Sequence, residues 1–90
     1  DPSERAVHVQ EQEPKRLTQL EFRMLYILMA NAGQTISSDR LVEHVWGYTG
    51  KGNRDLVRGL IKRLRTKIEV NVQEPRYIIT ITGAGYTLKT

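Results

Sequence analysis

The sequence predicts a small α+β domain in which three helices precede a C-terminal β-hairpin. Three observations predict this class. Apolar residues recur with helical spacing in three separate segments. Residues 77–82 and 86–89 are rich in β-branched and aromatic side chains, and Gly83 and Gly85 lie in the tight turn between them. A chain of 90 residues suits one domain with a single core.

The N-terminal region, residues 1–16, reads as a linker with a strand or hairpin. Residues 6–9 alternate in polarity, and residues 15–17 could pair back onto them. Two strands alone are marginal in water, so we expect them to lean on the main domain, residues 17–90, or to end a larger sheet. The chain begins Asp-Pro-Ser without a methionine, which suggests a piece of a longer protein.

The first helix is predicted by a capping box, in which Thr18 and Glu21 each satisfy a backbone N–H of the first turn. It should end near Gly33. Its apolar positions are Leu20, Phe22, Leu25, Tyr26, Leu28 and Met29.

A short extended piece, residues 34–36, should lead into a second helix that Ser37 or Ser38 caps and Gly47 ends. Its apolar stripe consists of Leu41, Val42, Val45 and Trp46. The following loop, residues 48–53, is rich in turn formers, and Asn53 is a plausible cap for the next helix.

The third helix, residues 54–69, is both amphipathic and strongly basic. At about 100° per residue, five apolar residues fall on one side. These are Val57, Leu60, Ile61, Leu64 and Ile68. The opposite side carries Gly59, Lys62, Arg63 and Thr66, flanked by Arg58 and Arg65. This helix carries a net charge of +4, equal to that of the whole chain, so the basic excess is concentrated on one element.

Such a concentrated basic stripe indicates an acidic partner, most commonly nucleic acid, more strongly than the same charge spread evenly would. By itself it fits a merely solvated face equally well. The chain has no cysteine, which is compatible with a reducing compartment and excludes a disulfide or a thiolate zinc site. His8 and His44 are isolated, so we expect no metal and no cofactor. No nucleophile elbow, phosphate-binding loop or dinucleotide motif is present, and we therefore expect no enzyme. The longest apolar run is too short to span a bilayer.

The predicted order of elements is that of a winged helix, in which the third helix enters the major groove and the hairpin, or wing, reaches the flanking backbone or minor groove. Five short motifs then resemble the OmpR/PhoB class of response-regulator DNA-binding domains, from about Leu17 to Leu88. They are Leu17-Thr18-x-x-Glu21-Phe22, Val45-Trp46-Gly47, Arg63-Leu64-Arg65-x-Lys67, Arg76-Tyr77-Ile78 and Thr82-Gly83-x-Gly85-Tyr86.

The resemblance implies a cytoplasmic bacterial transcription factor that binds double-stranded DNA. It implies a receiver domain in the same chain, a sensor kinase that phosphorylates that domain, and dimerisation on direct-repeat half-sites, with this fragment alone a monomer. It also implies a four-stranded N-terminal sheet, of which residues 5–17 would be the last part. The loop that touches RNA polymerase in some members corresponds here to Tyr48, Thr49, Lys51 and Asn53.

By position, the resemblance implies that DNA is contacted by Arg58, Lys62, Arg63 and Arg65 on the helix and by Thr80, Thr82 and Tyr86 on the hairpin. Two departures stand out, because many relatives carry an arginine at Asp55 and a long polar or basic side chain at Thr82. We therefore expect modest affinity as a monomer. Gly59 on the outward face is either a point of close approach to the groove or drift at a tolerant position, and we favour drift.

The aromatic residues and the overall function each leave alternatives open. We expect Trp46 and Tyr77 to be core residues, whereas Tyr86 could serve either the core or DNA. A protein-interaction winged helix that contacts RNA polymerase or another acidic partner is the alternative to DNA binding. An RNA-binding winged helix is weaker, because this helix cannot read a narrow A-form major groove.

Overall fold

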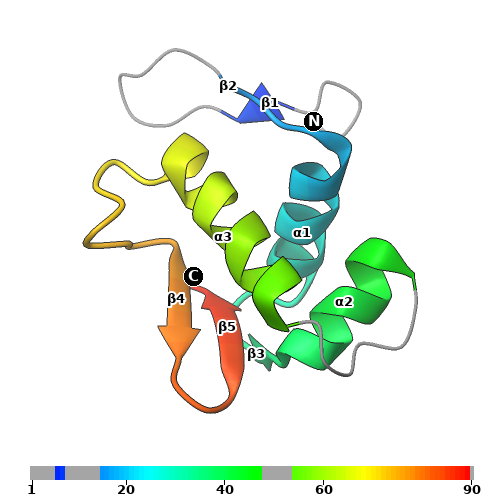
Figure 1. Ribbon diagram of the computed structural model, residues 1–90. Helices are drawn as coiled ribbons and strands as arrows, with labels where there is room; N and C mark the ends of the chain where they lie inside the picture. Colours follow the sequence, from blue (N-terminus) through cyan, green and yellow to red (C-terminus); the bar gives the residue numbers. More distant parts are fainter. Residues whose placement is uncertain (1–5, 8–14, 48–53, 90) are drawn as a thin grey trace.

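The computed structural model describes residues 6–7, 15–47 and 54–89. In these ranges, three helices and five short strands follow the predicted order (Figure 1). They are β1 (Ala6–Val7), β2 (Lys15–Arg16), α1 (Gln19–Ala30), β3 (Thr35–Ile36), α2 (Ser38–Trp46), α3 (Arg54–Ile68), β4 (Ile78–Ile81) and β5 (Gly85–Leu88). The predicted α+β winged helix is confirmed.

The ends of the first two helices have the predicted caps. The Thr18 hydroxyl accepts from the Glu21 N–H at 3.2 Å, and Glu21 Oε1 accepts from the Thr18 N–H at 2.9 Å, which completes the capping box of α1. At α2, the Ser37 hydroxyl accepts from the Arg40 N–H at 3.2 Å. Gly47 ends α2 in the left-handed region at φ 84°, which glycine adopts without strain.

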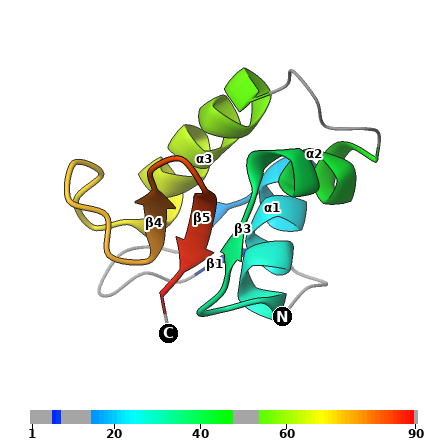
Figure 2. The same ribbon diagram turned by 90° about the horizontal axis from the view of Figure 1, so that it is seen from below.

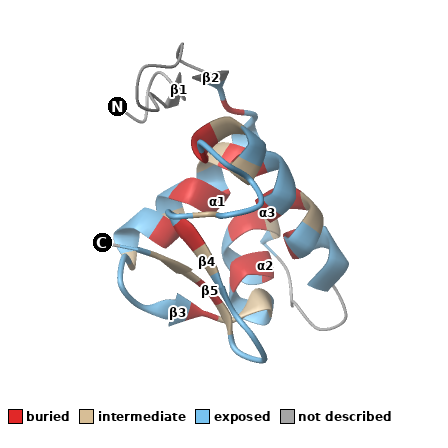
Figure 3. Cartoon of the chain, turned by 90° about the vertical axis from the view of Figure 1, so that its left-hand side faces the viewer, coloured by how far each residue is buried: buried red, intermediate tan, exposed pale blue. Residues whose placement is uncertain are grey.

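The three helices pack against one another around one core, and strand β5 also packs against α1. Figure 3 shows the buried residues on the facing sides of the helices and strands. Trp46 is half-buried against this core, as predicted. The fully buried residues include Met24, Leu28, Leu41, Val42, Val45, Val57, Leu64 and Ile78.

The sheet that carries the wing has the antiparallel strand order β3-β5-β4, and Figure 2 shows the three strands side by side. Pairing places Thr35 opposite Thr87 and Ile36 opposite Tyr86, so the short extended piece before α2 joins the C-terminal hairpin. The Thr35 and Thr87 hydroxyls share a hydrogen bond of 2.7 Å. A second pair, β1 with β2, forms the predicted N-terminal hairpin.

Two predictions near the C-terminus are wrong. Tyr77 is 37% exposed and is not a core residue. It precedes β4, which begins at Ile78, and side chains alternate between the faces of a strand, so the burial of Ile78 turns its neighbour outward. The third helix also ends at Ile68, one residue earlier than expected, although the Glu69 N–H still donates to the Arg65 carbonyl at 2.9 Å.

No helix in residues 15–47 or 54–89 is long and apolar enough to cross a membrane.

Candidate nucleic-acid interface

The helix α3 is fixed to the core by the predicted face. Val57, Leu60 and Ile61 are at most 1% exposed, and Leu64 and Ile68 are also buried. Lys62 and Arg63 are exposed, as the helical spacing predicts. Neither side chain makes a hydrogen bond or ion pair with the described part of the chain. Their charges therefore face solvent and are available to an anionic partner.

The first turns of α3 are less cationic than the sequence of arginines suggests, because Arg58 lies 3.6 Å from the Asp55 carboxylate. Both side chains are highly exposed, so this pair adds little to stability. Its effect is on the electrostatic potential, since Asp55 partly offsets the Arg58 charge.

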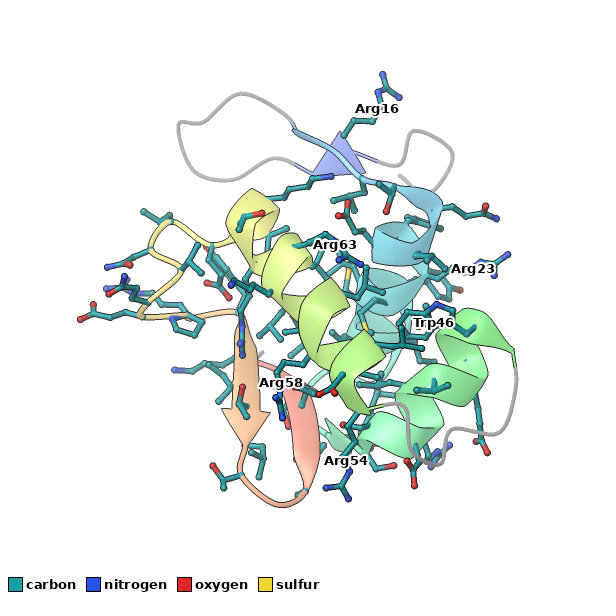
Figure 4. The ribbon with its side chains drawn as sticks, viewed as in Figure 1. Arg16, Arg23, Trp46, Arg54, Arg58 and Arg63 are labelled. Carbon is teal, nitrogen blue, oxygen red and sulfur yellow. The ribbon has the colours of Figure 1, made fainter. Side chains whose placement is uncertain are left out.

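A groove with a volume of about 380 Å³ separates the start of α3 from the wing. Arg54 and Arg58 line it from α3, Ser38 from the start of α2, and Thr80 and Thr82 from the wing. Figure 4 shows Arg54 and Arg58 on the end of α3 that lies beside the sheet, with Arg63 farther along the helix. Arg54, the first basic residue of the helix, is not among the DNA contacts predicted from the sequence.

Arg65, predicted to meet DNA, bonds to the wing within the domain. Its Nε and Nη2 donate to the Ile78 carbonyl at 3.2 and 2.8 Å, and Nη2 also donates to the Thr80 hydroxyl at 2.8 Å. The guanidinium carbon lies 5.9 Å from the centre of the Tyr86 ring, within cation–π range. Arg65 is half-buried as a result.

Tyr86 occupies the core position of β5 and is 9% exposed. Its ring supports the guanidinium of Arg65. Thr80 and Thr82 are exposed on the wing, as a contact with DNA requires.

The turn between α3 and β4 is organised by Glu69, which is 4% exposed. Its carboxylate accepts hydrogen bonds from the backbone N–H groups of Arg76, Tyr77 and Ile78, at 2.8 to 3.3 Å. The sequence places Glu69 at the helix end but does not reveal that it accepts these hydrogen bonds. A hydrogen bond across nine residues leaves no periodic signal.

The same end of α3 is tied to α1 through Lys67, which donates to the Arg16 carbonyl at 3.0 Å and to Glu21 Oε1 at 2.5 Å. Burial alone would raise the pKa of the Glu21 carboxyl. The hydrogen bonds from Lys67 and Thr18 and the Lys67 charge outweigh burial and hold that pKa below its ordinary value. Glu21 was predicted only as a local cap.

The remaining residues singled out from the sequence are the loop residues and the two histidines. Tyr48, Thr49, Lys51 and Asn53 lie outside the described residues, as does His8. His44 is exposed on α2, and the described ranges contain no group of three or more His, Asp or Glu side chains that could hold a metal ion.

The sequence of residues 12–88 matches the family described as "Transcriptional regulatory protein, C terminal". The chain belongs to this family. More narrowly, it is a C-terminal DNA-binding domain of the OmpR/PhoB type of response regulator.

Relatives of this OmpR/PhoB-type domain include two full-length regulators. The DNA-binding dual master transcriptional regulator RpaA of Synechocystis is 43% identical over 74 residues, 82% of this chain and 31% of RpaA. The KDP operon regulatory protein KdpE of Escherichia coli is 37% identical over 86 residues, 96% of this chain and 38% of KdpE. The chain thus spans about a third of the length of these relatives.

A solved structure with the same fold is the RstA DNA-binding domain of Klebsiella pneumoniae in complex with RstA box. Its TM-score is 0.85 at 35% identity, covering 99% of this chain and 87% of that chain. In the OmpR/PhoB-type domain described here, Lys62 and Arg63 are exposed on α3, the groove lies between the start of α3 and the wing, and Thr80 and Thr82 are exposed on the wing.

Proposed function

We propose that this domain binds double-stranded DNA sequence-specifically, as the effector domain of a two-component response regulator that controls transcription. In this proposal α3 enters the major groove and the wing lies on the flanking backbone or minor groove. The observation that carries it is the solvent-facing cationic side of α3, where Lys62 and Arg63 are exposed, together with the groove that Arg58 and the wing line.

The proposed contacts to DNA are Arg58, Lys62 and Arg63 on α3, with Thr80 and Thr82 on the wing. Arginine can fork onto guanine O6 and N7 or onto a phosphate, whereas lysine supplies a point charge. Arg65 and Tyr86 also contribute to DNA binding in this proposal, because they support the wing. The ion pair of Arg58 with Asp55 lowers the charge at the helix start. We therefore propose modest affinity for a single half-site.

The whole protein extends the proposal further. A receiver domain in the same chain, phosphorylated by a sensor kinase, would promote dimerisation on direct-repeat half-sites in the cytoplasm, and the fragment alone would be a monomer. The loop that contains Tyr48, Thr49, Lys51 and Asn53 would be available to RNA polymerase. The relatives' much greater length supports a longer chain of this kind.

The decisive experiment is selection of binding sites from random duplex DNA, which returns half-site sequence and spacing together. Enrichment of one motif at moderate salt is the expected result. An unenriched pool would contradict specific recognition and would favour the alternative, a winged helix that holds RNA polymerase or another acidic protein.

The selected duplex then tests the assigned face. The logarithm of affinity should fall with the logarithm of salt concentration, with a slope of about −0.9 per neutralised phosphate. Lys62→Ala and Arg63→Ala should each weaken binding, and any lost phosphate contact should make the slope shallower by about 1. If both variants kept the affinity and the slope of the unchanged domain, the DNA-binding face would lie elsewhere.

A further inference from the structure

Arg65, in the last turn of α3, and Glu69, the first residue after the helix, both bond to Ile78, the first residue of β4. Glu69 Oε2 accepts from the Ile78 N–H at 2.9 Å, and Arg65 donates twice to the Ile78 carbonyl. Because residues four apart lie on the same face of a helix, both groups project toward β4. The Ile78 N–H thus donates to Glu69, and the Ile78 carbonyl accepts from Arg65.

The guanidinium of Arg65 has three partners in the wing. It bonds to the Ile78 carbonyl in the backbone of β4 and to the Thr80 side chain, and it lies beside the Tyr86 ring of β5. Turning toward a phosphate would leave the Ile78 carbonyl without this partner and separate the charge from the ring, both unfavourable in a half-buried place. The side chains of Lys62 and Arg63 make no hydrogen bond or ion pair within the described residues.

We propose that Arg65 is a positioning residue that fixes the angle between α3 and the wing, and that it acts on DNA only through the wing. The proposal rests on the DNA-binding function proposed above. With Arg65 in place, α3 and the wing reach the duplex as one preorganised surface. Without it, the wing must be ordered during binding, and the cost of that ordering weakens the wing's contacts.

The test compares two duplexes that carry the same selected site. One extends under the wing, and the other is shortened by the flanking base pairs that footprinting of the unchanged domain assigns to the wing. Arg65→Gln should weaken binding to the long duplex by about tenfold, the loss of one or two wing contacts, and should leave binding to the short duplex nearly unchanged. An equal loss on both duplexes would overturn the proposal, because a direct contact beneath α3 survives shortening.

Arg63→Gln is the matched control on the same helix. Its side chain makes no hydrogen bond to the described residues of the wing, so Arg63→Gln should lose the same affinity on both duplexes. If the unchanged domain showed no sequence preference on either duplex, the proposed function itself would fail, which is a different result from any pattern among the Arg65 variants.

Arg65→Lys separates position from charge. Lysine keeps the positive charge but cannot fork onto the Ile78 carbonyl and the Thr80 hydroxyl together. It should therefore behave like Arg65→Gln on the long duplex, whereas recovery of full affinity would identify a charge contact with phosphate and overturn the proposal.

Thr80→Val removes one hydrogen-bond partner of Arg65 at an exposed site, and it also removes the Thr80 hydroxyl proposed to contact DNA. It should weaken binding to the long duplex only. Where the Arg65 variant does fold, the Arg65→Gln and Thr80→Val losses should be less than additive, and fully additive losses would show that the two residues act separately.

Discussion

The ammonium group of Lys67 lies 2.5 Å from the buried carboxylate of Glu21, which joins the last turn of α3 to the first turn of α1. The same carboxylate caps α1 through the Thr18 N–H. One acidic side chain therefore sets both the start of the first helix and the attachment of the helix proposed to read DNA.

Replacement of Glu21 by glutamine should make stability less dependent on pH. The folded-state pKa of Glu21 lies below its ordinary value of 4.5, so the stability that the carboxylate supplies is fully present above that value. It is lost as the pH falls through the lowered folded-state pKa. At pH 7, Glu21→Gln should cost about 1.5–3 kcal/mol, the worth of hydrogen bonds to a charged group.

Urea denaturation at several pH values checks this expectation. The difference in unfolding free energy between the unchanged domain and Glu21→Gln should shrink as the pH is lowered below 4.5. Glu74, which is exposed, provides the control, and Glu74→Gln should have little effect at any pH. A difference for Glu21→Gln that stayed constant down to pH 3 would contradict a role for the ionised carboxylate.

Replacement of Gly85 by alanine should separate β3 from β5. Gly85 has φ 149°, and an added Cβ would lie 2.0 Å from the Ile36 carbonyl oxygen. Both the backbone strain and the collision oppose the change, so we expect a loss of about 2–4 kcal/mol. Thermal unfolding measures the loss, and amide hydrogen exchange at Ile36 and Tyr86, which pair across β3 and β5, should become faster. Unchanged exchange there would contradict the close approach of the two strands.

Replacement of Gly59 by alanine should have the opposite effect. Outside the backbone of the helix itself, the atom nearest to an added Cβ would be Arg63 Nη1 at 3.8 Å, an ordinary van der Waals contact. Alanine should stabilise α3 by about 1 kcal/mol, because glycine is unfavourable in a helix interior. We expect DNA affinity to change by less than about twofold, or about 0.4 kcal/mol. A large loss of affinity with a normal gain in stability would instead show that the helix backbone approaches the groove closely at Gly59.

Replacement of Glu69 by alanine should loosen the segment between α3 and β4. Three backbone N–H groups, of Arg76, Tyr77 and Ile78, would lose their acceptor, for a loss of about 3 kcal/mol. Urea denaturation measures this loss, and amide exchange should accelerate first at these three residues. Glu69→Gln keeps one acceptor oxygen and should lose less; equal losses would point to packing and away from hydrogen bonding.

Local sequence signals were sufficient for most of the fold. The capping box of Thr18 and Glu21, the Ser37 cap and the Gly47 terminator are each made by residues at most five apart, so a sequence displays them directly. The pairing of Thr35 with Thr87 joins residues 52 apart, and a strand of two residues has too little pattern to reveal its partner. Tyr77 was misplaced because its chemistry fits a core, while its side of the strand was decided by Ile78.

The exposure of the charged side chains in the candidate site could be predicted from the sequence. Their hydrogen-bond partners from distant segments could not. Helical spacing was enough to place Lys62 and Arg63 on the exposed side of α3. The same spacing put Arg65 at the flank of that side, where the sequence cannot show that β4 supplies its partners. The second role of Glu21 was hidden for the same reason, because Lys67 is 46 residues away.

The bonding of Ile78 to α3 also bears on aggregation. β4 is an edge strand with the sequence Ile78-Ile79-Thr80-Ile81, a composition prone to pairing with strands of other molecules. With its N–H and C=O occupied by Glu69 and Arg65, Ile78 has no free backbone group to offer an incoming strand. The same two side chains thereby help keep neighbouring copies from joining edge to edge when they are crowded together.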